Sequence, residues 1–173
     1  MPGPLQSNLE MKARCADLVA ARAAALRLGA RSTDLLIQID TYFRVSSGRL
    51  KLRCTQGQAG QLIWYDRPDQ SEASISRYYV VPLMDVEALK TALTAALGVR
   101  GEVCKHRQLF LWHNVRIHLD DVAGLGQFVE FEAVLSSDET EAASRDRLNR
   151  LCRELNISPS DTCSTSYVEL LGL

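Results

Sequence analysis

The sequence predicts an α+β fold in which antiparallel strands outnumber helices. Polar and apolar residues alternate with a period of two in most segments, and helical signals appear in only four places. The connections between the alternating segments are short. Short connections favour antiparallel pairing, because a parallel pair needs a crossover of about a dozen residues or more.

Residues 8–14 and 49–53 show the alternation most clearly. In residues 8–14, three apolar residues alternate with polar and charged ones. Residues 49–53 place Arg49, Lys51 and Arg53 on one face and two leucines on the other. The second strand is therefore expected to separate an apolar core from a strongly positive surface.

Further strands are predicted along the rest of the chain. Two follow the segments Q-G-Q-A-G-Q and R-P-D-Q-S-E-A, at about residues 61–67 and 76–82, and the glycines of the first segment favour a hairpin turn. Residues 103–122 predict a hairpin that turns near His113 and carries alternating charges on both strands. A turn with two glycines then leads into residues 128–133, where two carboxylates share one face.

Helical signals interrupt these strands in four segments, which span residues 17–28, 86–97, 139–155 and 158–173. Gly29 and Gly98 follow the first two helices as expected for helix ends, and Asp85 is a candidate N-cap of the second. Ser158 and Pro159 suit the N-cap and first position of the short final segment. The first two helices are expected to pack against the sheet.

The composition is that of an ordinary globular protein. The chain has 173 residues, of which 46% are hydrophobic and 24% charged, and one compact domain over residues 1–173 is expected. This composition excludes intrinsic disorder and collagen-like structure. Lys and Arg number 20 against 21 Asp and Glu, so binding of large nucleic acids or anionic membranes by bulk electrostatics is not expected.

The cysteines and the N-terminal segment indicate a reducing compartment. Five cysteines are present without a CxxC pair, which disfavours both a disulfide framework and a zinc site. The opening M-P-G-P-L-Q-S-N lacks the features of a signal peptide, and no apolar stretch is long enough to span a membrane. The expected location is the cytoplasm.

The charged faces are sorted by sign, which is unusual for solvated surfaces. Residues 44–53 contain four bases and no acid, whereas Glu130 and Glu132 lie on a strand without bases. If these faces converge, the crowded cations need a polyanion, and a triphosphate suits both Arg and Lys. A separate carboxylate cluster would hold a divalent cation, and oxygen ligands favour Mg²⁺ or Mn²⁺ over zinc.

The motifs resemble the CYTH superfamily of triphosphate tunnel metalloenzymes, which includes class IV adenylate cyclases and thiamine triphosphatases. The opening N-L-E-M-K-A-R resembles the family's ExExK strand. Later segments match in the same order: D-T-Y-F from Asp40, G-R-L-K-L-R at 48–53, L-I-W-Y-D-R-P-D at 62–69, K-H-R at 105–107, V-R-I-H-L-D at 115–120, G-L-G-Q-F-V-E-F-E at 124–132 and S-Y-V-E-L-L at 166–171. The resemblance spans nearly the whole chain and is strongest to the class IV cyclase-like members.

The resemblance implies a closed or nearly closed antiparallel β-barrel of about eight strands with flanking helices, forming a tunnel. The implied metal ligands are Glu10, Glu130 and Glu132. The implied phosphate-binding residues are Lys12, Arg14, Lys51, Arg53, Arg67, Lys105, Arg107 and Arg116. Lys12, Arg53 and Arg116 are the implied catalytic residues, and Asp120 is a further position of the motif set.

One position departs from the family motif. Asn8 replaces the first glutamate of ExExK, which removes a negative charge from the expected metal site. His106, His113 and His118 are interpreted as structural or surface residues, because no two of them share a helical i,i+4 spacing. The strand aromatics Trp64, Trp112, Tyr78 and Tyr79 are interpreted as core residues before adenine-stacking ones.

The resemblance implies a metal-dependent enzyme with a small triphosphate substrate such as ATP, thiamine triphosphate or tripolyphosphate. Two reactions stay open: cyclisation of ATP to cyclic AMP and pyrophosphate, and hydrolysis of an organic or inorganic triphosphate. The alternative is a weakly catalytic or non-catalytic module that binds a nucleotide or polyphosphate, which the replacement at Asn8 favours. Whether the chain acts alone or as a homodimer also stays open.

Overall fold

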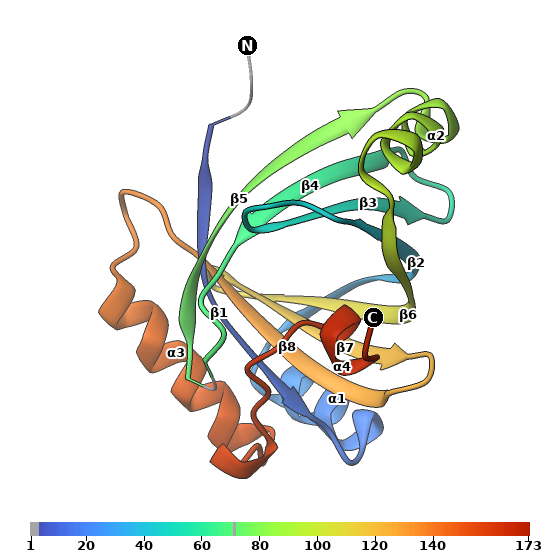
Figure 1. Cartoon of the computed structure of the whole chain (residues 1–173). Coiled ribbons are helices and arrows are strands. Elements are labelled where there is room, and N and C mark those ends of the chain that lie inside the picture. The colour runs from blue at the N-terminus through green and yellow to red at the C-terminus, as the bar shows by residue number, and fades with distance from the viewer. Residues whose placement is uncertain (1–3, 71) are drawn as a thin grey trace.

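A computed structural model describes residues 4–70 and 72–173, in which eight antiparallel strands close into a barrel (Figure 1). The order around the barrel is β1-β5-β4-β3-β2-β6-β7-β8, and β8 pairs back with β1. The strands are β1 (Gln6–Arg14), β2 (Arg31–Phe43), β3 (Arg49–Thr55), β4 (Gly60–Asp66), β5 (Ser74–Leu83), β6 (Val99–Trp112), β7 (Val115–Val122) and β8 (Gly126–Val134). The helices are α1 (Leu18–Arg27), α2 (Val86–Leu97), α3 (Glu141–Glu154), the short 3₁₀ helix η1 (Pro159–Asp161) and α4 (Tyr167–Leu170). The predicted α+β class and the closed barrel are confirmed.

The barrel is charged inside and apolar outside. Because side chains alternate along a strand, β3 turns Lys51 and Arg53 toward the interior, while Leu52 on the opposite face is fully buried. On β1, Lys12 likewise lines the interior and Met11 joins the outer core. The faces sorted by sign in the sequence thus converge on one internal space.

Helices α1 and α3 cover the outer faces of β1, β7 and β8 (Figure 1). Leu9 of β1, Phe131 of β8, Ala25 of α1 and Leu148 of α3 belong to one apolar cluster and are fully buried. Helix α1 begins after Asp17, whose carboxylate accepts hydrogen bonds from two backbone amides of the first turn. This packing holds three strands of the barrel wall in place from outside.

The other two α-helices lie at different parts of the barrel. Helix α2 contacts β2 and β3, and its predicted N-cap Asp85 is confirmed, since it accepts from the amide of Ala88 at 2.9 Å. Helix α4 lies at a mouth of the barrel, where Tyr167 and Val168 pack with residues such as Phe128 (Figure 1). No helix in the described ranges has the length and apolar character needed to cross a bilayer.

The element boundaries differ from the prediction mainly at β2 and β6. The alternation pattern did not predict strand β2, because the consecutive apolar residues Leu35 and Leu36 break the period of two. An irregularity in its pairing with β6 lies at the same place, between Ser32 and Leu35. Strand β6 begins at Val99, earlier than the predicted residue 103, and α3 begins after Thr140 instead of at residue 139.

Candidate active site

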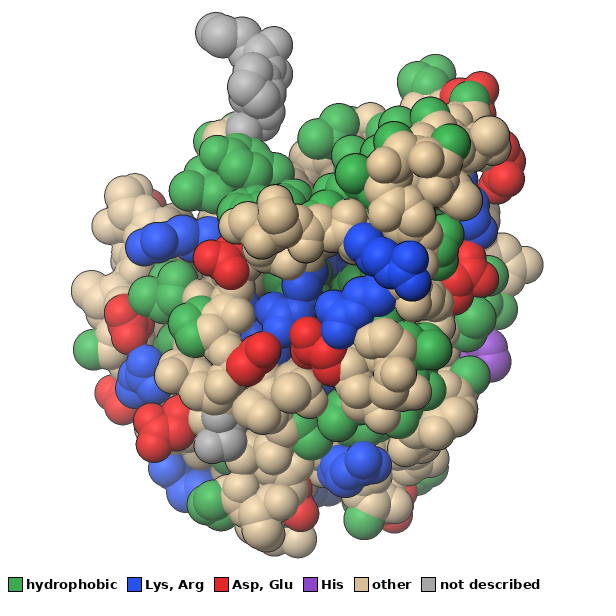
Figure 2. Space-filling model, in the orientation of Figure 1, with side chains coloured by type: hydrophobic (Ala, Val, Ile, Leu, Met, Phe, Trp, Pro, Cys, Tyr) green, Lys and Arg blue, Asp and Glu red, His purple; other side chains and the backbone are tan. Residues whose placement is uncertain are grey.

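The barrel encloses a cavity of about 180 Å³. Ten of the eleven residues expected at the site line this cavity: Glu10, Lys12, Lys51, Arg53, Arg67, Lys105, Arg107, Arg116, Glu130 and Glu132. The eleventh, Arg14, is exposed; its guanidinium donates to the carbonyl oxygen of Leu125 and lies over the ring of Phe128. In Figure 2, Lys and Arg side chains gather in the hollow at the centre of the face shown, with acidic side chains beside them.

The acidic residues of the cavity come from neighbouring strands in register. Glu10 of β1 is directly opposite Glu132 of β8, and Lys12 is opposite Glu130. On the other side of β8, His118 of β7 is opposite Glu130. Residues directly opposite in an antiparallel pair lie on the same face, so these side chains converge inside the barrel.

The Glu10–Glu132 pair brings like charges together, which is unfavourable without a cation. Burial, together with the charges of Glu130 and Glu132, raises the pKa of Glu10 to about 7. Arg67 opposes this effect, because its Nη1 donates to Oε1 of Glu10 at 3.1 Å. A carboxyl group in a cavity whose pKa is raised by burial and by neighbouring charges marks a candidate functional site.

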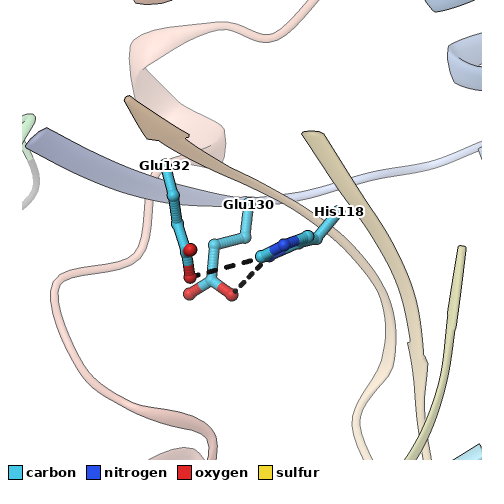
Figure 3. A group of neighbouring side chains, drawn as sticks. All are labelled: His118, Glu130 and Glu132. Carbon is cyan, nitrogen blue, oxygen red and sulfur yellow. Dashed lines mark hydrogen bonds and ion pairs between the residues drawn. The ribbon is translucent and has the colours of Figure 1, made fainter. Parts of the chain in front are cut away.

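His118 belongs to this acidic group, although the sequence interpretation made it a structural or surface residue. Its Nδ1 lies 3.4 Å from Oε2 of Glu130 and 3.7 Å from Oε1 of Glu132 (Figure 3). Ligand atoms of the three residues all lie within 4.8 Å of one another. The helical-spacing criterion missed this residue because the grouping arises from pairing between strands. His106 and His113 are exposed, as expected.

These three side chains have the chemistry of a divalent-cation site. Carboxylate oxygens suit Mg²⁺ and Mn²⁺, and the imidazole nitrogen favours Mn²⁺ of the two. Glu10 faces Glu132 from across the strand pair and could join them, but its Oε1 is engaged by Arg67. The structure groups His118 with Glu130 and Glu132, and Glu10 lies directly opposite Glu132. The ligand set of Glu10, Glu130 and Glu132 stays a prediction, and His118 is a further candidate ligand.

Asn8 supports the acidic group in a different way from a metal ligand. Its side-chain nitrogen donates to Oε2 of Glu132 at 3.4 Å, and its oxygen accepts from the hydroxyl of Tyr78 at 3.1 Å. Arg116 donates to the same Asn8 oxygen and to the Tyr78 hydroxyl. The amide oxygen is therefore occupied, and Asn8 orients Glu132 and Arg116.

The basic residues gather around Asp40 of β2, which is fully buried. Arg53 holds this carboxylate in a fork, with Nε and Nη2 each 2.7 Å from one oxygen. Lys105 and Lys51 donate to Oδ2 at 2.8 and 3.2 Å. Burial alone would raise the pKa of Asp40, but Arg53, Lys105 and Lys51 hold it well below its usual value.

The same clustering affects the lysines. Burial lowers the pKa of Lys105 to about 7, and the charges of Arg53, Arg107 and Lys51 add to this effect while Asp40 opposes it. Burial likewise lowers the pKa of Lys51. A bound anion would favour the protonated form of Lys105 and so raise its pKa.

Arg107 connects the basic and acidic groups. Its Nε and Nη2 form a fork with Asp120 at 2.7 and 2.6 Å, and Nη2 also donates to Glu130 at 2.8 Å. The hydroxyl of Tyr167 in α4 donates to Asp120 at 2.8 Å. Asp120, which the motif comparison included, thus lies opposite Arg107 on the inner face of the barrel and fixes its guanidinium.

Sequence reasoning missed Asp40 as a site residue, along with His118 and the tyrosines Tyr42, Tyr65, Tyr78 and Tyr167 that line the cavity. The signal at Asp40 was its place in the D-T-Y-F motif, which carried no chemistry by itself. Its role follows from partners 13 and 65 positions away along the chain.

Comparison with known proteins identifies similar chains. A Methanocaldococcus jannaschii protein named "Putative adenylate cyclase" is 28% identical to this chain over 138 residues, which cover 78% of this chain and 77% of that protein. A solved Pyrococcus horikoshii protein superposes with a TM-score of 0.82 at 22% identity, over 94% of this chain and 98% of the other.

Two further solved structures share the fold. One, a Vibrio parahaemolyticus protein also named a "putative adenylate cyclase", has a TM-score of 0.78 at 22% identity and covers 97% of this chain and 99% of the other. A Hippeastrum protein named a "putative adenylyl cyclase" and described as revealing a dominant triphosphatase activity has a TM-score of 0.65 at 15% identity, with 95% of each chain covered. A family model for the CYTH domain matches residues 6–167, and the chain accordingly belongs to the CYTH domain family.

Proposed function

We propose that the protein is a divalent-metal-dependent enzyme that binds a triphosphate compound in its barrel. The observation that carries this proposal is the separation of charge within one cavity: cations converge around Asp40, and carboxylates converge around His118. The cations around Asp40 could bind the anionic tail of a triphosphate. A metal ion held by the carboxylates and His118 could coordinate its phosphate oxygens.

The formal charges support a ligand of this kind. Seven Lys and Arg side chains line the cavity together with three Glu, and the buried aspartates Asp40 and Asp120 contact the lining bases. A fully ionised triphosphate ester carries about four negative charges, and one divalent ion offsets about two of them. A triphosphate with a single metal ion therefore matches the positive excess of the described residues.

The position of each residue in the cavity indicates its role. Lys51, Arg53 and Lys105 would bind phosphate oxygens, while Lys12 and Arg116 border the acidic group and would contact the phosphate nearest the metal. His118, Glu130 and Glu132 would hold Mg²⁺ or Mn²⁺, which supplies Lewis-acid polarisation of a phosphoryl oxygen.

Two reactions fit this lining. If the 3′-hydroxyl of ATP lies in line with the α-phosphorus, cyclic AMP forms and pyrophosphate leaves. If water lies in line with a terminal phosphorus, phosphate leaves instead. The relatives include proteins named for the first reaction and one described by the second, and the substrate is ATP, another organic triphosphate or tripolyphosphate.

The test is incubation of the purified protein with Mn²⁺ or Mg²⁺ and, separately, ATP, tripolyphosphate and thiamine triphosphate. Cyclic AMP with pyrophosphate supports the cyclase, and released phosphate supports the triphosphatase. Saturable binding without any product supports a binding module, which Asn8 favours because it replaces an expected carboxylate. If none of the three compounds binds, the proposal is wrong.

A further inference from the structure

Asp40 is a buried carboxylate that the proposed reaction does not use directly. It is fully buried and lies opposite Arg53 on the inner face of the barrel, and its three partners separate it from the cavity that they line. Arg53 and Lys51 reach it from β3 and Lys105 reaches it from β6, on the two sides of β2. One carboxylate thus gathers cations from both neighbouring strands.

The three cations would repel one another without this carboxylate. Lys105 and Lys51 both donate to the same oxygen, Oδ2, so their ammonium groups lie close together. The fork with Arg53 fixes the plane of the guanidinium through Nε and Nη2. Among the described residues, Nη1 of Arg53 has no hydrogen-bond partner, so this edge is free for a phosphate oxygen.

We propose that Asp40 is a positioning residue that holds Lys51, Arg53 and Lys105 in one arrangement, so that all three meet the same phosphate group of the substrate. This inference rests on the proposed triphosphate function. Asp40 itself never contacts the substrate. It acts by fixing the orientation of residues that do, which is the contribution that pre-organised charges make to phosphoryl transfer.

A positioning role and a purely electrostatic role predict different kinetics. Removing the charge of Asp40 changes the electrostatics of the cavity, so a purely electrostatic role would alter binding of a triphosphate without slowing its reaction. A loss of positioning slows turnover, because the bound phosphate then adopts many arrangements. The ratio of changes in kcat and KM therefore separates the two roles.

The experiment compares Asp40→Asn with the wild-type protein, using whichever triphosphate the wild type turns over with Mn²⁺. We expect kcat to fall by about 10- to 100-fold, which is a larger factor than any change in KM. Asp34→Asn, at an exposed position on the same strand, is the matched control and should behave as wild type. An unchanged kcat in Asp40→Asn overturns the inference.

A second variant separates charge from position. Asp40→Glu keeps the negative charge but moves the carboxylate by one methylene, so we expect kcat to fall here as well. Full activity in Asp40→Glu would show that only the charge matters and would contradict the positioning role. If Asp40→Asn melts below the assay temperature, Asp40→Glu carries the test, because it retains the charge that compensates the three cations.

A binding measurement keeps the inference testable if the wild type only binds. The groups that face Lys105 are Asp40 of β2, Lys51 and Arg53 of β3, Arg107 of β6, Asp120 of β7 and Tyr167 of α4. Asp40 favours the charged form of Lys105, so its removal should make metal-free tripolyphosphate binding fall off at a lower pH than in the wild type.

Calorimetric titrations with tripolyphosphate at pH values from about 6 to 9 measure the pH at which binding falls off. This range roughly covers the titration of Lys105. The same pH dependence in Asp40→Asn and wild type would contradict the inference alone. Failure of the wild type to bind tripolyphosphate, ATP or thiamine triphosphate would instead contradict the proposed function.

Discussion

Arg53 and Arg107 are held by the same device on different strands. Each lies directly opposite an aspartate of the neighbouring strand, Asp40 and Asp120, and forms a fork with its Nε and Nη2. Both aspartates are fully buried. A guanidinium whose inner edge is fixed in this way presents a defined outer edge to the cavity, at little further cost in side-chain entropy when a phosphate binds.

The first prediction concerns Arg53→Ala. Hydrogen bonds to a charged group contribute about 1.5–3 kcal/mol, so removal of this guanidinium should weaken metal-free tripolyphosphate binding by about 10- to 100-fold. Isothermal titration calorimetry measures the affinity. Arg22→Ala, at an exposed position of α1, is the control and should bind as wild type. Unchanged affinity in Arg53→Ala would mean that the phosphates lie elsewhere.

The second prediction concerns Glu132→Gln, which keeps the size of the side chain but removes its charge. Glu132 lies next to His118 in the candidate metal group. The Mn²⁺ concentration that gives half-maximal activity should rise by at least about tenfold. The exposed Glu154→Gln is the control. If both variants respond to Mn²⁺ as the wild type does, the metal lies outside this group.

At the level of residues, the sequence predicted the cavity lining better than the contacts within it. The alternation in residues 49–53 and the family motifs predicted that Lys51 and Arg53 share one face. This prediction needs only the sequence of a single strand. The contacts of Asp40 and His118 depend on which strands are neighbours. Strand order is a property of the closed barrel, and a period-two pattern carries no information about it.

At the level of elements, α4 is the least expected structure. It has only four residues, so its helical form depends on contacts more than on intrinsic propensity. Glu169 accepts from the backbone amide and hydroxyl of Ser166 at its start and from Arg49 of β3. Tyr167 reaches Asp120 in the barrel. These contacts explain why the S-Y-V-E-L-L motif folds against the cavity.

The third prediction tests this anchoring with Tyr167→Phe, which removes only the hydroxyl. Asp120 then loses one donor but keeps its fork with Arg107. The free energy of unfolding should fall by about 1.5–3 kcal/mol, which lowers the melting temperature by roughly 3–12 °C for a chain of this size. Tyr79→Phe, on an exposed tyrosine of β5, is the control. Equal melting temperatures would show that the hydroxyl adds no net stability.

The elements that the sequence predicted well are those with local signals. Asp85 and the glycines Gly29 and Gly98 mark helix ends, and their effect depends only on nearby backbone groups. Strand β2 lacked such a signal, because the consecutive apolar residues Leu35 and Leu36 interrupt the period-two pattern. Its assignment depends on pairing with β3 and β6, which lie later in the chain.

At the level of the whole molecule, the near-neutral net charge of -1 conceals strong local separation. The charged faces of the strands point inward and the apolar faces point outward, where helices α1, α2 and α3 cover part of them. Folding therefore buries many ionisable groups in one cavity without a ligand. Groups whose pKa values shift on burial link the stability of the barrel to pH.

The last prediction is that the metal-free and substrate-free protein has a minimum of stability near pH 7. Glu10 has a folded-state pKa of about 7 against an ordinary value of 4.5, so the folded state binds more protons than the unfolded state between these values. Its contribution to stability is complete below about pH 4.5 and is lost as the pH rises to 7. Lys105 has a folded-state pKa of about 7 against 10.5, so between these values the unfolded state binds more protons. Stability therefore recovers from pH 7 to 10.5, and each change amounts to a few kcal/mol, in the order of magnitude that such shifts imply.

Urea unfolding of the metal-free protein from about pH 5 to 9.5 measures this profile. Glu10→Gln should flatten the decline on the acidic side, and Lys105→Met should flatten the rise on the alkaline side, because each variant removes one of the two groups. Mn²⁺ with tripolyphosphate should remove the minimum in the wild type, since the ligand charges favour ionised Glu10 and protonated Lys105 together. A stability maximum near pH 7 in the metal-free protein would contradict the account, because the two buried groups would then have ordinary pKa values. The pH at which the empty barrel is least stable is thus the pH at which its occupied form gains most from binding.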